Sequence, residues 1–399
     1  MSLSSEEYRR YGRQMQVVPF DSLSGQLRLH NSRLLVVGCG GLGSAALLYL
    51  ASAGIGCIGL LDHDRVEVSN LHRQIIHDTT TVGWYKTESA SRRMKAINPN
   101  IDVVCHTEFL SNDNSVQLFE NYDLVLDCTD NPITKYLISD TCVVVGIPLV
   151  SASAVQTSGQ LIILNFNNGP CYRCIHPVPP RPENIATCAD NGVIGSCVGL
   201  VGTLMATESI KVLTNYYNAE NPYKPIMLMY SGYQGNDGES LKSFKMRGKQ
   251  PSCLCSSMTI DTIKSINYTQ FCGAINYDLV DEKYRITFDE IAELSGSPEK
   301  VCIVDVRPME QFNIANFGEA TEDKGFPPLL NIPYKTLVRL DDEALRKRLP
   351  PDVTIVSVCK MGNDSRLATK HLRDKGYIAY DLKGGLNEYA QNCDFNVYW

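Results

Sequence analysis

Two cysteines far apart in the sequence, Cys188 and Cys359, are the residues best suited to covalent chemistry. Cys188 lies in a polar, proline-rich loop, and Cys359 ends an apolar run and opens a tight polar turn. A polar loop is a poor place for a structural cysteine and a good one for a mobile nucleophile. Each cysteine follows a different set of nucleotide-like or anion-like motifs. The sequence therefore predicts that one chain couples an activation chemistry to a sulfur chemistry.

A glycine-rich turn marks a phosphate-binding site in the first half of the chain. The segment Gly38-Cys-Gly40-Gly41-Leu-Gly43 follows an expected strand at 34–37 and opens an expected helix. Glycines let the backbone approach phosphates, and a helix N-terminus supplies N–H donors. Asp62 ends the next expected strand, where a carboxylate would bond ribose hydroxyls. These features alone are typical of any dinucleotide-binding enzyme, including an NAD-dependent oxidoreductase.

Polar and cationic residues after Asp62 favour a reaction that expels pyrophosphate. They are Asn70, Arg73 and Gln74, followed by Lys86 at the start of a helix and Asp130 with Asn131 after a strand. Cationic side chains neutralise charge that develops on phosphate, and a carboxylate holds Mg²⁺. Hydride transfer has no use for such a cluster. Taken one by one, these residues are equally compatible with a solvated charged loop.

Two cysteine pairs have the spacing of metal ligands. Cys171-Tyr-Arg-Cys174 is followed about eighty residues later by Cys253-Leu-Cys255. Four thiolates around one Zn²⁺ form a closed structural site, and the alternative is a chance pair of exposed thiols. The remaining cysteines beside apolar runs are expected to be small buried hydrophobic residues, namely Cys57, Cys105, Cys128, Cys142 and Cys302.

The apolar pattern predicts two α/β domains in the 399 residues. A Rossmann-like domain with a mostly parallel sheet is expected over 1–255, a connector over 256–283 and a smaller α/β domain over 284–399. A net charge of −7 argues against nucleic-acid binding. No uninterrupted apolar run reaches the length of a membrane span, and the N-terminus lacks a secretory core. A cytoplasmic protein is expected.

The first domain resembles the adenylation domain shared by MoeB, ThiF and the ubiquitin-activating enzymes. The motifs that match are Gly12-Arg13-Gln14, the glycine turn, Asp62, Asn70-Leu-His-Arg73-Gln74, Lys86 and Cys128-Thr-Asp130-Asn131. The resemblance implies that ATP adenylates the C-terminal Gly-Gly carboxylate of a ubiquitin-like protein. It implies that Asp62 holds the ribose, that Asn70, Arg73 and Lys86 contact phosphates, and that Asp130 binds Mg²⁺. Arg13 would reach into the partner's site of a homodimer, as an arginine finger does.

The resemblance also bears on the cysteines. Family members carry two Cys-x-x-Cys pairs at the metal site, whereas this chain has Cys-x-Cys as its second pair, which tightens the chelate ring. The motif around Cys188 resembles the crossover-loop cysteine of the sulfur-transferring eukaryotic members. That resemblance leaves two roles open for Cys188, an acyl carrier through a thioester and a resolving thiol.

The second domain resembles a rhodanese domain. The matching pieces are Val304-Asp-Val-Arg307-Pro308, Asn331-Ile-Pro333, Cys359-Lys-Met-Gly-Asn-Asp-Ser and Gly384-Gly385. In such a domain the backbone N–H groups of the loop surround the cysteine sulfur, and their field is expected to lower the thiol pKa and to stabilise a persulfide. Arg366 follows Cys359 by one residue more than a phosphatase loop requires, so that alternative is weak.

Together the two domains resemble a eukaryotic adenylyltransferase–sulfurtransferase. The resemblance implies ATP, Mg²⁺ and one structural Zn²⁺ per subunit, a ubiquitin-like sulfur carrier, and an upstream persulfide donor such as a cysteine desulfurase or another sulfurtransferase. The carrier's thiocarboxylate would serve 2-thiolation of tRNA wobble uridine, protein conjugation by the modifier and, in many organisms, molybdopterin synthesis. Two alternatives stay open: an NAD-dependent oxidoreductase, and a non-catalytic or activation-only scaffold with a vestigial rhodanese domain.

Overall fold

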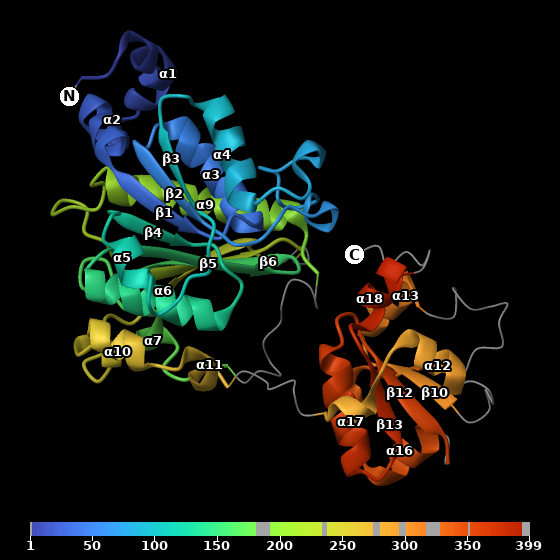
Figure 1. Ribbon diagram of the computed structural model, residues 1–399. Coiled ribbons are helices and arrows are strands. Elements are labelled where there is room, and N and C mark those ends of the chain that lie inside the picture. The colour runs from blue at the N-terminus through green and yellow to red at the C-terminus, as the bar shows by residue number, and fades with distance from the viewer. Residues whose placement is uncertain are drawn as a thin grey trace. The chain divides into compact units, whose positions relative to one another are not determined.

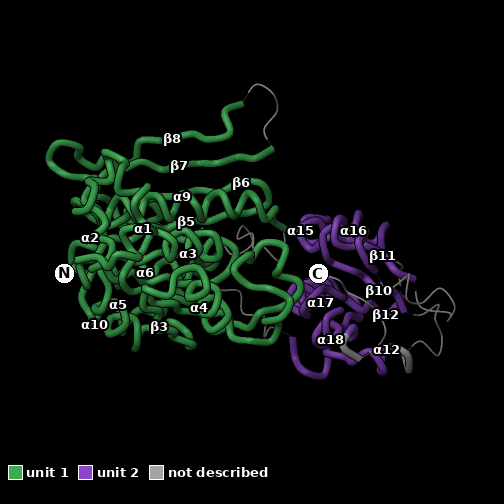
Figure 2. The backbone as a smooth tube through the Cα atoms, turned by 90° about the horizontal axis from the view of Figure 1, so that it is seen from above, with its two compact units in different colours: residues 1–274 green, residues 275–399 purple. Residues whose placement is uncertain are grey.

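The chain forms two α/β units, residues Met1–Ala274 and Ile275–Trp399 (Figure 2). The computed structural model describes residues 2–180, 192–233, 238–273, 280–294, 301–316, 328–349 and 352–392. Each unit contains one β-sheet with helices on both faces (Figure 1). The predicted α/β fold class is therefore confirmed.

The first unit is built around an eight-stranded sheet. Its strands are β1 (Arg33–Val37), β2 (Cys57–Leu61), β3 (Asp102–His106), β4 (Leu124–Asp127), β5 (Leu149–Val155), β6 (Ser158–Leu164), β7 (Ile226–Ser231) and β8 (Leu241–Lys245). Its helices are α1 (Ser5–Met15), α2 (Ser22–Asn31), α3 (Gly41–Ala53), α4 (Lys86–Ile97), α5 (Ser115–Phe119), α6 (Pro132–Val145), α7 (Tyr172–Ile175), α9 (Gly195–Leu213), α10 (Ile260–Ser265) and α11 (Tyr268–Phe271).

The strand order of this sheet creates a switch point. The order is β3-β2-β1-β4-β5-β6-β7-β8, parallel from β3 to β5 and antiparallel from β5 to β8. From β1 the chain first turns to β2 and β3 and later returns to β4 on the other side. In open α/β sheets ligands bind beyond the carboxyl ends of the strands at such a point.

Two apolar cores sandwich the sheet because alternate side chains of its buried strands point to opposite faces. Leu34 and Val36 of β1 pack in the core under α3, α4 and α9, whereas Leu35 and Val37 pack against α5 and α6 (Figure 1). Helix α9 is long and apolar enough by composition to cross a membrane. Its packing against α3 and against strands β5 and β6 accounts for that composition.

The segment after the second cysteine pair differs from the expected connector. Helices α10 and α11 pack on α6, where Ile263 and Tyr268 join a core with Tyr136 and Leu137. Sequence patterning missed these helices because each is too short to show a helical period. A second difference concerns Cys105, which is exposed rather than buried because β3 is the edge strand of the sheet.

The second unit contains a five-stranded parallel sheet in the order β11-β10-β12-β13-β9. Core residues cover both of its faces. The strands are β9 (Arg285–Ile286), β10 (Val301–Asp305), β11 (Leu329–Asn331), β12 (Thr354–Val358) and β13 (Ala379–Leu382). The helices are α12 (Phe288–Leu294), α13 (Met309–Ile314), α15 (Tyr334–Leu337), α16 (Asp342–Arg348), α17 (Asn363–Asp374) and α18 (Gly385–Asn392).

Candidate functional site

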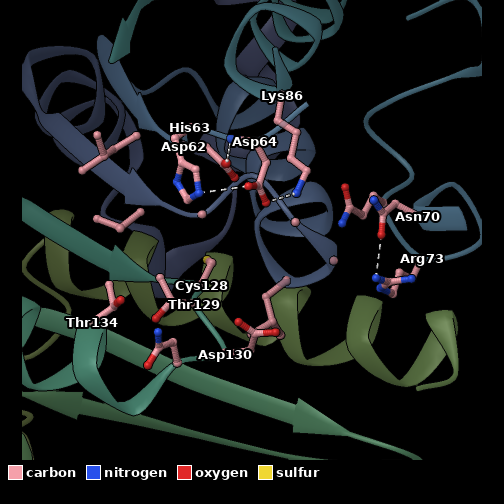
Figure 3. Close-up of a pocket in the computed structure, with 18 of the residues that line it drawn as sticks. Asp62, His63, Asp64, Asn70, Arg73, Lys86, Cys128, Thr129, Asp130 and Thr134 are labelled. Atoms are coloured by element: carbon pink, nitrogen blue, oxygen red, sulfur yellow. Dashed lines mark hydrogen bonds and ion pairs between the residues drawn. The ribbon is translucent and has the colours of Figure 1, made fainter. Parts of the chain in front are cut away.

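A cavity of about 540 Å³ lies beyond the carboxyl ends of β1, β2 and β4. It is the switch point of the first sheet, and residues from several separate segments meet there (Figure 3). The predicted nucleotide-binding residues that line it are Gly38, Gly40, Gly41, Asp62, Asn70, Arg73, Gln74, Lys86, Asp130 and Asn131. Ten predicted residues, which lie up to about ninety positions apart in the sequence, therefore line the same cavity.

The glycine turn and Asp62 are joined by a direct hydrogen bond. The backbone N–H of Cys39 donates to Asp62 Oδ2 at 2.8 Å, and the N–H of Asp64 donates to Oδ1 at 2.9 Å. Gly38 has φ +98°, a left-handed conformation that favours glycine. Gly43 does not line the cavity. A Cβ there would lie 2.1 Å from the Gly38 carbonyl oxygen, so Gly43 permits close helix packing.

Lys86 and Asp64 form the main ion pair of the cavity. Lys86 Nζ lies 2.7 Å from Asp64 Oδ2, with the lysine side chain 8% exposed and the aspartate 51% exposed. Asp64 also contacts His63 at 3.0 Å, and the His63 ring stacks on Phe109 with centroids 3.5 Å apart. Sequence reasoning missed Asp64, His63 and Phe109. Asp64 could have been predicted as a cavity residue because it follows Asp62 by only two positions.

Asn70 and Arg73 lie on another side of the cavity, away from Lys86 (Figure 3). Arg73 Nη2 donates to Asn70 Oδ1 at 2.7 Å, and Nη1 donates to the Ser69 carbonyl at 3.1 Å. These bonds hold the guanidinium beside the turn that carries both residues. The cavity therefore presents cationic groups from two directions.

Asp130 and Asn131 follow β4 and line the cavity, and Asp130 lies across it from Lys86 (Figure 3). Asp130 is exposed, so its carboxylate is accessible to a ligand. Asn131 has a structural task as well, because its Oδ1 accepts the Ile133 N–H and caps α6. The nearby carboxylate Asp127 is buried and is held by Lys135 at 2.8 Å.

The four predicted metal-binding cysteines form one cluster. All four sulfur atoms lie within 4.8 Å of one another. The distances from Cys171 Sγ to Cys174 Sγ and to Cys253 Sγ are 3.6 Å, and Cys174 Sγ lies 3.8 Å from Cys255 Sγ. A tetrahedral site with Zn–S bonds of about 2.3 Å places its sulfurs about 3.8 Å apart. The donor set and the spacing therefore fit Zn²⁺, and the Cys-x-Cys pair does not prevent convergence.

Cys359 lies at the carboxyl end of β12, in a loop that leads into α17. Gly362 caps the helix in a left-handed conformation, with φ +81°. Cys359 Sγ lies 3.4 Å from Ser365 Oγ. Burial raises the pKa of the Cys359 thiol, against the opposing effect of hydrogen bonds from Ser365. The prediction of a lowered thiol pKa is therefore wrong for this structure, because Cys359 is only 4% exposed.

The N-terminus of α18 packs directly on this loop. The N–H groups of Leu386 and Asn387 donate to the carbonyls of Cys359 and Lys360, both at 3.0 Å. A Cβ on Gly385 would lie 2.4 Å from the Cys359 carbonyl oxygen. Gly385 is thus required by the close approach of two backbones, whereas a Cβ on Gly384 would meet the Glu388 side chain.

Other pieces of the second domain's motifs stabilise its fold. Arg307 is buried and makes a two-pronged ion pair with Asp305, at 2.9 Å from Nε to Oδ1. Asn331 Nδ2 donates to the backbone carbonyls of both residues. These side chains therefore support the sheet rather than face a substrate.

The two remaining predicted residues are Cys188 and Arg13. Cys188 lies outside the described residues. Arg13 is exposed on α1 and does not line the cavity of its own chain.

Comparison with known proteins agrees with both folds. A family model described as the ThiF family matches residues 11–255, and one described as a rhodanese-like domain matches residues 287–392. The solved structure "Crystal structure of E. coli MccB" is 24% identical, with a TM-score of 0.53 over 63% of this chain and 73% of that chain. This last likeness concerns the fold alone.

Curated relatives match the chain over nearly its full length. The "Adenylyltransferase and sulfurtransferase UBA4" of Meyerozyma guilliermondii is 44% identical over 400 residues, covering 99% of this chain and 91% of the relative. The protein of the same name from Saccharomyces cerevisiae (strain YJM789) is 46% identical over 412 residues, covering 99% and 91%. That of Ogataea parapolymorpha is 42% identical over 405 residues and covers 99% of both chains.

The fold and the sites thus define a ThiF-type adenylation domain joined to a rhodanese-like domain. The chain belongs to the UBA4 family of adenylyltransferases and sulfurtransferases. It is an enzyme, and the oxidoreductase alternative is excluded.

Proposed function

We propose that the chain activates the C-terminal glycine of a ubiquitin-like sulfur-carrier protein with ATP and then converts it to a thiocarboxylate. The observation that carries this proposal is the pairing of two sites in one chain. A cavity with glycine, cationic and carboxylate groups would supply activation, and a buried cysteine with hydrogen bonds from Ser365 and from the Met361 backbone would supply sulfur.

The first step joins the carrier's carboxylate to the α-phosphorus of ATP and releases pyrophosphate. Asp62 and the glycine turn would hold the ribose and the α-phosphate. Lys86 and Arg73 would neutralise charge that develops on the leaving pyrophosphate, and the Asn70 amide N–H would donate a hydrogen bond to it. Mg²⁺ bound at Asp130 would supply a Lewis acid for the phosphate oxygens.

A homodimer would complete this site. Arg13 is exposed and does not line its own cavity. We propose that it reaches the triphosphate in the cavity of the partner subunit, where a guanidinium would stabilise the transition state.

The four-cysteine cluster would hold one structural Zn²⁺. Burial raises the pKa of the Cys171 thiol above its usual range, and a bound cation reverses that effect by stabilising the thiolate. The sulfur spacing supports this assignment.

The second step transfers sulfur from Cys359. An upstream persulfide donor leaves Cys359 as a persulfide, whose terminal sulfur attacks the acyl carbon and expels AMP. Cys188 then attacks the inner sulfur of the acyl disulfide, which releases the thiocarboxylate and leaves a Cys188–Cys359 disulfide. An external dithiol returns both cysteines to thiols. If Cys188 instead takes the acyl group first, the persulfide attacks a thioester and expels the Cys188 thiolate.

The thiocarboxylate would serve 2-thiolation of tRNA wobble uridine, conjugation of the modifier to proteins and molybdopterin synthesis, in the cytoplasm. The decisive test is mass spectrometry of the carrier's C-terminus after incubation with the enzyme, ATP–Mg²⁺ and a persulfide donor. The expected product carries sulfur in place of one carboxyl oxygen. An unchanged carrier, with pyrophosphate release intact, would contradict the sulfur-transfer half of the proposal.

A further inference from the structure

The segment that leads from the cysteine cluster toward the second unit is packed onto the first unit. This segment, residues 258–273, is called the anchor segment here and contains α10 and α11. Its side chains Ile263, Tyr268 and Cys272 are buried against Tyr136 and Leu137 of α6. These three side chains thus belong to the core of the adenylation unit, and Met258, Ile266 and Phe271 pack against it, whereas Ile260 is exposed.

A buried ion pair ties the anchor segment to the cysteine cluster. Arg173, which lies between Cys171 and Cys174, donates from Nε and Nη2 to the Asp140 carboxylate at 2.8–3.0 Å. The Tyr268 hydroxyl donates to the same carboxylate at 2.8 Å. Arg173 therefore links α7 to α11 through a carboxylate of α6.

Aromatic rings pack near the planar Arg173 guanidinium, whose N–H groups bind Asp140. Its guanidinium carbon lies 4.4 Å from the centroid of the Phe271 ring and 5.1 Å from that of Tyr136. Arg173 is 6% exposed and Asp140 is fully buried. A paired charge in these surroundings loses its stabilisation if the anchor segment moves away.

A second attachment holds the other helix of the segment. Asn112 Nδ2 donates to the carbonyls of Ile263 and Ile266 at 2.9 and 2.8 Å, and so satisfies the C-terminal end of α10. Asn112 lies two residues after Leu110, which lines the nucleotide cavity. The anchor segment is therefore fixed at both of its helices.

The second unit also holds its own end of the chain. Arg285 lies 3.3 Å from the buried Asp381, and Glu282 lies 2.7 Å from Lys383. The Arg373 guanidinium covers the Tyr284 ring at 3.3 Å. The covalent link between the two attachments therefore runs only from Gly273 to Asp281.

This arrangement sets the reach of the sulfur-bearing unit. About eight residue steps from Gly273 to Asp281 span at most about 29 Å, whereas about 24 steps from Ser257, without the anchor, would span at most about 86 Å. Effective concentration falls as roughly the −3/2 power of tether length, so a threefold longer tether lowers it about fivefold.

We propose that Arg173, with Asp140 and Tyr268, is a positioning residue for sulfur transfer, because it fixes the start of the tether beside the cysteine cluster and limits how far Cys359 travels from the activated carboxyl group. This inference rests on the proposed function. The cysteine cluster thereby gains a task beyond local stability.

The test uses the full-length dimer and two kinds of variant. The double variant Ile263→Asp and Tyr268→Ala releases the anchor segment without altering the cavity or the cysteines. An insertion of about sixteen Gly and Ser residues after Gly273 lengthens the tether while the anchor stays in place. Hydrogen exchange over 259–273 reports release, zinc content and ATP–pyrophosphate exchange report an intact first unit, and single-turnover thiocarboxylate formation reports transfer.

Both variants are expected to keep zinc and pyrophosphate exchange and to lose about fivefold in the single-turnover transfer rate. Only the double variant should show faster hydrogen exchange over 259–273. A variant that carries both changes should lose less of the transfer rate than the product of the two separate fold-losses. Arg173→Gln should behave as the double variant does.

A wild-type transfer rate in the insertion variant overturns the proposal, whatever the double variant does. So does a loss of transfer in the double variant without faster hydrogen exchange over 259–273. If the wild-type enzyme itself forms no thiocarboxylate, the proposed function is contradicted. This result differs from a failure of the tether proposal, in which the wild-type enzyme is active.

Discussion

Lys86 and Asp64 form an ion pair inside the nucleotide cavity, with 2.7 Å between Nζ and Oδ2. The lysine comes from the start of α4, and the aspartate follows β2. The pair keeps a nearly buried cation neutralised in a space that must receive phosphates. Its two members should therefore affect ATP binding in opposite directions.

Lys86→Met should reduce ATP–pyrophosphate exchange by about 100-fold or more, the usual effect of losing a donor to developing charge. Asp64→Asn should lower the KM for ATP by up to about fivefold, since phosphate no longer competes with a partly exposed carboxylate. Steady-state exchange kinetics measure both. A KM that rises in Asp64→Asn would show that the carboxylate helps to bind ATP–Mg²⁺.

The two halves of the reaction should separate by mutation. Asp130→Ala should abolish ATP–pyrophosphate exchange because the carboxylate for Mg²⁺ is lost. Cys359→Ala should preserve exchange and abolish thiocarboxylate formation. Parallel exchange and mass-spectrometric assays measure these effects. Thiocarboxylate formation by Cys359→Ala would favour an activation-only enzyme with a vestigial rhodanese domain.

Gly385→Ala should disrupt sulfur transfer alone. The residue has φ +64°, and a Cβ would overlap the carbonyl oxygens of Cys359 and Lys360. Gly376→Ala is the matched control, because Gly376 also has a positive φ of +88° but meets nothing within 4 Å. The control should cost about 1 kcal/mol of stability and keep activity. Equal losses of transfer in both variants would mean that backbone strain, and not the overlap, is responsible.

Zinc should be present and removable. We expect one zinc per subunit by elemental analysis, and its loss in Cys253→Ser, with a lower unfolding temperature. Cys105→Ser serves as the control, since Cys105 is an exposed cysteine on the edge strand. Purified wild-type protein without zinc would refute the assignment.

Acidification should weaken the glycine turn through His77. Burial lowers the pKa of His77, whose Nε2 lies 3.0 Å from the Cys39 carbonyl oxygen. The unfolded chain therefore binds a proton near pH 6.5 that the folded chain resists. Its contribution to stability is present above that pH and is lost as pH falls from about 6.5 toward the lower folded pKa.

His77→Gln retains a donor and does not titrate, so its free energy of unfolding should fall less between pH 7 and pH 5.5. Denaturant titrations of both proteins at each pH measure the difference. If the free energy of unfolding falls by the same amount in both proteins, His77 is not the cause of the acid destabilisation.

Much of this protein was predictable because the informative residues act locally. The roles of the glycine turn, Asp62 and Lys86 can be predicted from the strand or helix that each adjoins. Apolar periodicity in the sequence predicts those strands and helices. The same holds for Cys359, which follows a strand and opens a helix. Residue types and short spacings therefore determined the fold class, the activation site and the sulfur site.

Contacts between distant segments were decided only by the tertiary structure. Asp64 pairs with Lys86 across 22 positions, and Tyr268 meets Asp140 across 128. No local pattern marks such pairs, because the sheet order brings their segments together. The raised pKa of the Cys359 thiol likewise follows from burial by other segments. The sequence by itself determined which groups are the candidates for chemistry, and the packing of remote elements decided their burial, their partners and the length of chain that joins the two units.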